Sequence, residues 1–226
     1  MIKIENIDVY GFEAAIRGAR NPMNSWNLSD SWQSDFTQDG KGGYIIGPND
    51  YKLLKNLTIA GPEHRKWNRM VTVTMDITAP LYWWKEYDTY KVGTVANSCS
   101  TMHKIQAKKF ELNDFSHEHL LEGGLLHLHD TIRLLNEARE IFNNFDYFES
   151  KLKKAYSFEV TKKDVWWQMI QLLPTSYNQK RTVHLNYEVL GTIYHQRRHH
   201  KLDEWVEFCD TIKTLPYSEF ITREFE

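Results

Sequence analysis

The alternation of apolar and polar residues in the chain is clearest between residues 71 and 78. Val71, Val73, Met75 and Ile77 are separated by threonines and one aspartate, and this period of two predicts a strand with one buried face. Pro80 ends the pattern. The interleaved apolar and charged residues at positions 2–9 predict a first strand in the same way.

Apolar residues at helical spacing predict helices over 13–20, 49–60, 80–91, 129–145, 161–174, 181–199 and 202–215. Asn49 or Asp50 is the expected cap of the second helix, and Thr161 with Asp164 forms a capping box. Asn186, Leu190, Ile193 and Arg197 would share one face of the helix from 181. That face either lines a binding cleft or only reaches solvent at its ends.

Two stretches of small or polar residues interrupt these elements. Residues 21–49 are rich in Gly, Ser and Asn and predict a long loop insertion. The stretch "VGTVANSCSTM" (92–102) has small side chains, so its backbone can approach a ligand closely or form a tightly packed turn.

Composition narrows the class of protein. The 226 residues are 41% hydrophobic, which suffices for one substantial core and predicts a single domain over 1–226. The formal net charge is −2 and the basic residues are dispersed, so we expect no nucleic-acid polymer as partner. Two cysteines far apart in sequence indicate a reducing, cytoplasmic location. No apolar run has the length of a signal peptide core or a membrane span, so no membrane partner is expected.

Histidines suggest metal binding only weakly. His117, His119, His127 and His129 lack a Cys partner, an HExxH motif or a carboxylate at a familiar spacing, so we predict no metal site. The chain also lacks a Walker loop, a GxGxxG and a GxSxG motif, which argues against common nucleotide hydrolases, Rossmann enzymes and α/β-hydrolases.

The order of motifs resembles the flavin-dependent thymidylate synthase family. An "EH" pair precedes the strand and Pro80, and placing the family's Pro there lays its Arg-His-Arg signature on Thr89, Tyr90 and Lys91. The signature Ser falls on Cys99. In the second half "LLP" is followed by Asn186 and Arg197 at the family's spacing.

The resemblance implies an α/β (α+β) fold with a mixed sheet flanked by helices, assembled as a homotetramer. It implies FAD, a pyrimidine nucleotide, NADPH and a folate donor as ligands, with FAD stacked against the pyrimidine. Flavin-binding positions are His64, Lys91 and Asn186, and the expected catalytic residue is Arg197. The positions expected to bind substrate are Lys85, Glu86, Asn97 and Cys99.

Several arginines of the family are replaced in this chain. Thr101 and Ile170 stand where phosphate-binding arginines are expected, and Glu188 and Thr192 replace flavin-contacting residues. A carboxylate at position 188 is expected to repel a diphosphate. Two functions therefore stay open: FAD-dependent methyl or hydride transfer to a pyrimidine nucleotide, and a catalytically inactive homologue that serves as a binding or structural module.

The aromatic run "WWKEYDTY" distinguishes these two functions. In an enzyme site Tyr90 and Lys91 would face a cleft with Arg197, whereas in a structural module Trp83, Trp84 and Tyr87 would fill that cleft.

Overall fold

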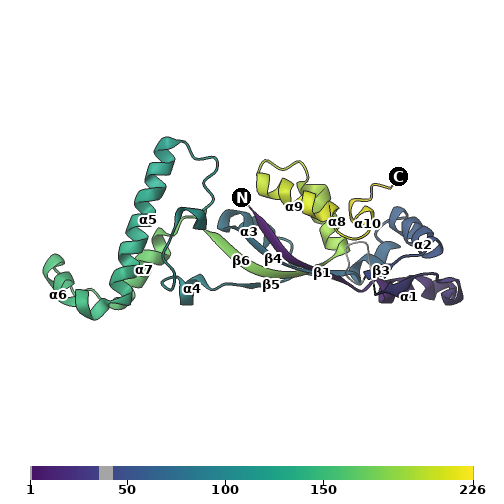
Figure 1. The fold of residues 1–226 in the computed structure, drawn as a ribbon, viewed down its shortest axis with the longest axis horizontal. Helices are drawn as coiled ribbons and strands as arrows, with labels where there is room; N and C mark the ends of the chain where they lie inside the picture. The colour runs from purple at the N-terminus through teal and green to yellow at the C-terminus, as the bar shows by residue number, and fades with distance from the viewer. Residues whose placement is uncertain (1, 36–42, 226) are drawn as a thin grey trace. The chain divides into compact units, whose positions relative to one another are not determined.

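A four-stranded sheet is the central feature of the computed structural model, which describes residues 2–35 and 43–225 (Figure 1). Its strands lie in the order β1-β4-β6-β5. They span Lys3–Tyr10 (β1), Thr72–Pro80 (β4), Asn178–Asn186 (β6) and Val95–Ser98 (β5). The predicted α/β fold with a sheet flanked by helices is confirmed.

Strand β4 shows why the sheet has one apolar and one polar face. Val73, Met75 and Ile77 are fully or almost fully buried, as the alternating pattern predicts. On the other face the Asp76 carboxylate accepts hydrogen bonds from Asn6 (2.9 Å) and Thr182 (2.6 Å). The polar face therefore satisfies part of its own hydrogen-bonding capacity.

The chain divides into two compact units, and β4, β6, β5 and α3 (Leu81–Tyr87) each contribute residues to both. The larger unit comprises residues 2–77, 86–97 and 181–226. Its helices are α1 (Phe12–Arg20), α2 (Pro48–Ile59), α8 (Tyr187–Arg197), α9 (Asp203–Lys213), α10 (Glu219–Thr222) and the 3-10 helix η3 (Arg65–Arg69). In Figure 1, α8 and α9 lie along one face of the sheet.

The smaller unit, residues 78–85 and 98–180, has a helical core of its own. Its remaining helices are α4 (Thr101–Lys104), η4 (Leu112–Asp114), α5 (Glu122–Asn143), α6 (Phe145–Ala155) and α7 (Lys162–Leu172). Buried Leu135 and Met169 belong to one apolar cluster, and α5 packs against α7. The predicted capping box is confirmed, since the Thr161 and Asp164 side chains each bond the other residue's backbone N–H. The predicted single domain over 1–226 stays a prediction.

The described residues of the predicted loop insertion over 21–49, namely 21–35 and 43–49, include short regular elements. They contain η1 (Asn21–Met23), η2 (Trp26–Leu28) and the antiparallel strands β2 (Trp32–Ser34) and β3 (Gly43–Ile45). Part of the predicted loop, residues 36–42, lies outside the described residues.

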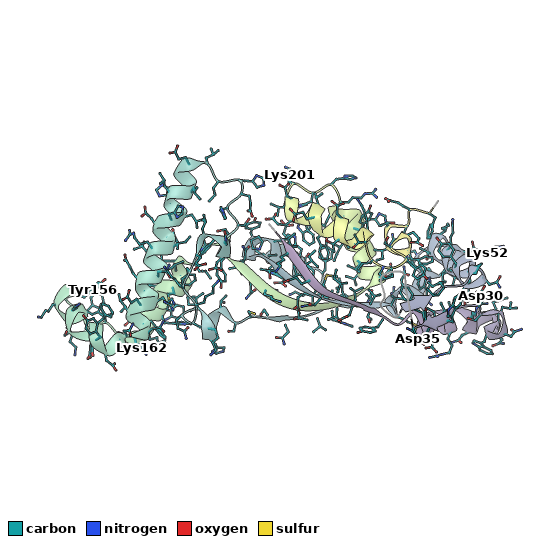
Figure 2. The ribbon with its side chains drawn as sticks, viewed as in Figure 1. Asp30, Asp35, Lys52, Tyr156, Lys162 and Lys201 are labelled. Atoms are coloured by element: carbon teal, nitrogen blue, oxygen red, sulfur yellow. The ribbon has the colours of Figure 1, made fainter. Side chains whose placement is uncertain are left out.

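The start of α2 differs from the prediction in its cap. Gly47 occupies the N-cap position, and the Asp30 carboxylate accepts hydrogen bonds from the backbone N–H groups of Asn49 (2.9 Å) and Asp50 (3.1 Å). Asp30 is labelled in Figure 2. A side chain 20 residues away thus performs the role that the sequence assigned to a local residue.

The predicted helix from residue 181 is wrong for its first turns. Strand β6 continues to Asn186, and only then does α8 begin. Val183 and Leu185 are buried while Thr182 and His184 are exposed. This alternation has the period of a strand, not of a helix.

The small-residue stretch 92–102 also differs from a simple turn. Val95–Ser98 forms the edge strand β5, with every residue exposed, and α4 follows from Thr101. Cys99 joins them, and its N–H donates to the Lys180 carbonyl (3.0 Å).

Among residues 2–35 and 43–225, no helix combines the length and apolar character that crossing a membrane requires.

Candidate functional site

A cavity of about 530 Å³ lies in the larger unit, at the start of α8. Three segments meet there: the end of η3, the turn after α3, and the first turns of α8. The lining residues are Arg69, Thr89, Tyr90, Lys91, Val92, Gly93, Asn186, Glu188, Val189 and Thr192. Its volume is in the usual range of small-molecule sites.

The turn after α3 reaches the cavity because its backbone closes tightly. Tyr90 N–H donates to the Tyr87 carbonyl (3.0 Å), and Gly93 adopts a φ of 78°. A Cβ on Gly93 would lie 3.0 Å from Asn186 Nδ2 and 3.3 Å from Val189 Cγ2. Glycine is therefore needed here both for its left-handed backbone and for close approach to α8.

The beginning of α8 forms the opposite wall. Asn186 is the N-cap, and its Oδ1 accepts a hydrogen bond from Val189 N–H (3.0 Å). Tyr187 N–H donates to the carbonyl of Val71 (3.0 Å), the residue before β4, and this bond fixes the start of α8. Both contacts position Asn186 at the cavity.

Glu188 does not present a free negative charge to this cavity. Its carboxylate receives Arg65 Nε at 2.8 Å and Arg65 Nη2 at 3.0 Å, and Arg223 Nη2 lies 3.8 Å away. The Arg65 and Glu188 side chains are only 10% and 16% exposed, so solvent screens this pair weakly. Burial, reinforced by the Arg65 guanidinium, lowers the pKa of Arg223. The expected repulsion of a diphosphate by Glu188 is thus largely offset.

Arg197, the predicted catalytic residue, is bound to other side chains of the protein. Its Nη1 donates to Glu86 Oε2 (2.7 Å) and its Nε donates to the Tyr90 hydroxyl (2.9 Å). The guanidinium also lies over the Trp205 ring, 4.8 Å from its centre, and Trp205 Nε1 donates to the same Glu86 oxygen (3.0 Å). Arg197 and Glu86 thus satisfy each other, and neither lines the cavity.

Only two of the three predicted flavin-binding residues line the cavity. Lys91 and Asn186 do, while His64 is exposed at the N-cap of η3 and outside the lining. Of the predicted substrate-binding residues besides Glu86, Lys85 and Cys99 belong to the smaller unit and Asn97 to the larger one, and all three are exposed.

The aromatic run "WWKEYDTY" is partly core and partly cavity lining, so it matches neither the enzyme site nor the structural module alone. Trp83, Trp84 and Tyr87 are at most 2% exposed and serve as core, with Trp84 Nε1 donating to the Gln179 carbonyl (2.9 Å). Tyr90 and Lys91 instead line the cavity. The tryptophans do not line it.

The histidine-rich segment shows no metal centre. His127 and His129 are exposed on α5, and the described part of the chain contains no group of three or more His, Cys, Asp or Glu side chains placed to hold a metal.

Sequence reasoning missed two arginines of the site, Arg65 and Arg69. Both belong to η3, where Arg65 binds Glu188 and Arg69 lines the cavity. The only available signal was the basic segment "RKWNR" directly before the predicted strand at Val71. Its relation to α8 depends on contacts more than 100 residues apart in sequence.

The lining residues fit a flavin nucleotide in chemical character. Tyr90 supplies an aromatic ring, Val92 and Val189 supply apolar surface, and Lys91 and Arg69 supply positive charge. With Glu188 bound to Arg65, the cationic side chains of the lining are not opposed by a free carboxylate.

Comparison with known proteins agrees with this fold. Thymidylate Synthase X (ThyX) from Helicobacter pylori, crystallised with FAD and dUMP, has a TM-score of 0.62 at 14% identity, over 97% of this chain and 96% of that one. A second ThyX structure from that organism, also complexed with FAD and dUMP, gives a TM-score of 0.59 at 14% identity, covering 96% of each chain.

A methylase is also similar. The UMP/dUMP methylase PolB from Streptomyces cacaoi, bound with 5-Br dUMP, has a TM-score of 0.56 at 14% identity and covers 99% of this chain and 95% of that one. No protein-family model and no curated protein sequence matches the chain. The predicted resemblance is confirmed in the fold: along nearly its whole length, this chain has the fold of flavin-dependent thymidylate synthases.

Proposed function

We propose that this protein binds FAD in the cavity at the start of α8 and transfers a methyl group or hydride to a pyrimidine nucleotide. The observation that carries the proposal is that Lys91 and Asn186, both expected to bind flavin, line one cavity although they are 95 positions apart in the sequence. The fold supports it, because similar structures were crystallised with FAD and dUMP. NADPH, a folate donor and a homotetrameric assembly belong to the same proposal.

The protein's own residues have binding and positioning roles in this proposal. Bound FAD supplies the hydride chemistry, so no protein nucleophile is required. Lys91 offsets negative charge on the ligand, and Tyr90 offers its aromatic ring as a contact surface. The capped start of α8 holds Asn186 in place. The exposed Lys85, Asn97 and Cys99 remain candidates for substrate contact.

A binding module without catalysis is the second candidate. It is favoured by the contacts of Arg197, whose guanidinium is bound by Glu86 and Tyr90 and stacked on Trp205. A cation held in this way has few donors left for a substrate phosphate or ring oxygen.

A flavin titration tests the proposal. Purified protein should absorb near 450 nm or quench flavin fluorescence on addition of FAD. Thr192→Phe should block binding, because Thr192 lines the cavity and is exposed. His195→Phe, on the same helix but outside the lining, is the matched control and should bind normally.

The outcomes separate the two functions. Thymidylate formation from dUMP, a methylene folate and NADPH by FAD-loaded protein would establish the transferase. FAD binding without turnover of either UMP or dUMP would leave the binding module. Absence of FAD binding, or binding unaffected by Thr192→Phe, would refute the assignment of the flavin to this cavity.

A further inference from the structure

The charged side chains that line the cavity differ in whether they are paired. Glu188, the lining carboxylate, accepts three hydrogen bonds from Arg65, and Arg223 Nη2 lies 3.8 Å away. Arg69 and Lys91 line the same cavity, and among the described residues neither side chain has a hydrogen bond or an ion pair. The cavity therefore has an excess of positive charge at two side chains that are available to a ligand.

The two cations come from segments that the fold brings together. Arg69 is the last residue of η3, and buried Trp67 and Asn68 fix that helix, with Trp67 packed edge-on against Phe220 at 4.9 Å. Lys91 lies in the turn held to α8 by the close approach of Gly93. A guanidinium offers paired donors and an ammonium offers a point charge, a combination suited to phosphate oxygens.

We propose that Arg69 and Lys91 form an anion-binding site for the phosphate of the cavity's ligand, so that the cavity selects phosphorylated flavins over the uncharged riboflavin. This inference rests on the proposed function, and it assigns ligand selection to Arg69, which the sequence did not indicate. Asn186, Thr89 and Thr192 supply neutral polar surface, so the discrimination by charge comes from the two cations.

The first test compares FMN, FAD and riboflavin by fluorescence titration. Because both cations are exposed, we expect FMN to bind with about tenfold higher affinity than riboflavin. This ratio of affinities should decrease as the sodium chloride concentration is raised. The advantage should fall in Arg69→Gln and Lys91→Gln and disappear in the double variant. Lys66→Gln removes an exposed charge from the same 3-10 helix outside the lining, and it should leave the advantage unchanged.

Equal affinity for FMN and riboflavin would overturn the anion site while leaving the flavin cavity intact. So would an FMN advantage that persists in the double variant. Circular dichroism of each variant separates loss of the site from loss of the fold.

A second probe separates this inference from the proposed function. If no flavin binds, inorganic pyrophosphate should still raise the melting temperature of the wild-type and Lys66→Gln proteins, but not that of the double variant. That result would support the anion site without the flavin. An unchanged melting temperature in the wild-type protein would overturn it.

Discussion

Arg197 and Glu86 show how a side chain's neighbours decide its role. The resemblance assigned catalysis to one and substrate binding to the other, but their side chains lie 2.7 Å apart and are 19% and 36% exposed. Trp205 contributes to the same contact from α9. These residues therefore link α3, α8 and α9 within the larger unit.

A double-mutant cycle on this pair measures the link. We expect Glu86→Gln and Arg197→Gln each to lower the free energy of unfolding by about 1 kcal/mol, with a coupling of similar size, because the pair is only partly shielded from water. Urea unfolding of both single variants and the double variant gives the coupling. Lys85→Gln, an exposed neighbour on α3, serves as control. A coupling of zero would show that the contact adds no stability.

The two cysteines differ in reactivity for a physical reason. Cys99 is exposed, whereas Cys209 is buried, and burial raises the pKa of the Cys209 thiol to about 11. A thiol reagent near neutral pH should modify one cysteine per folded chain and two after denaturation, since the thiolate is the reactive form. Cys99→Ser should abolish the fast reaction. Rapid modification of both thiols in the native protein would contradict the burial of Cys209.

At the scale of elements, α2 depends on a buried ion pair. Arg20 Nε lies 2.6 Å from Asp50 Oδ1, and the two side chains are 5% and 0% exposed. Burial by itself would raise the pKa of Asp50, but hydrogen bonds from Ser31, Ser29 and Arg20 outweigh it, and the pKa is lowered. This network holds the end of α1, the residues after η2 and the first turn of α2 together.

Asp50→Asn should lower the free energy of unfolding by about 3 kcal/mol near neutral pH, because Arg20 then remains buried without a carboxylate. A carboxyl group with a lowered folded-state pKa adds stability above its unfolded pKa and loses it as pH falls through the folded value. The difference in free energy of unfolding between the Asp50→Asn variant and the wild-type protein should thus become smaller below about pH 4. Asp35→Asn, in the described part of the same region but exposed, is the control. A pH-independent difference in urea unfolding would exclude the charge as its cause.

Element boundaries were predictable where a local pattern decides them. The Thr161 capping box and the alternation of β4 were both read correctly from neighbouring residues. The helix wrongly extended back to Arg181 shows the limit, because helical spacing from Asn186 onward was continued into a segment of alternating burial. The remote cap from Asp30 leaves no local pattern, so the sequence could not reveal it.

At the scale of the whole molecule, the fold was predictable from the order and spacing of motifs, even at 14% identity to similar structures. The candidate site was less predictable from the sequence than the fold. Lys91 and Asn186 meet at the cavity, but the Arg65 to Glu188 contact joins residues 123 apart and has no counterpart in the motifs. Pair contacts of this kind arise from packing, which a single sequence does not display.

The single predicted domain can be tested by unfolding. Since β4 and β6 contribute residues to both compact units, we expect one cooperative transition in urea, with tryptophan fluorescence and circular dichroism giving the same midpoint. Trp166 and Trp167 of α7 report on the smaller unit, and Trp205 on the larger one. Two separated midpoints would show that the units unfold independently.

Gly93 also restricts how the sequence can vary. An alanine there would adopt an unfavourable left-handed backbone, at a cost of about 1 kcal/mol, and its Cβ would press on Asn186, the cap of α8. In a saturation library sorted for folded protein, residues other than glycine should therefore be depleted at position 93, whereas substitutions at its exposed neighbour Val92 should not be. In a second library that varies positions 93 and 186 together, folded variants with a larger residue at 93 should more often have a smaller residue at 186, because the two side chains compete for the same space.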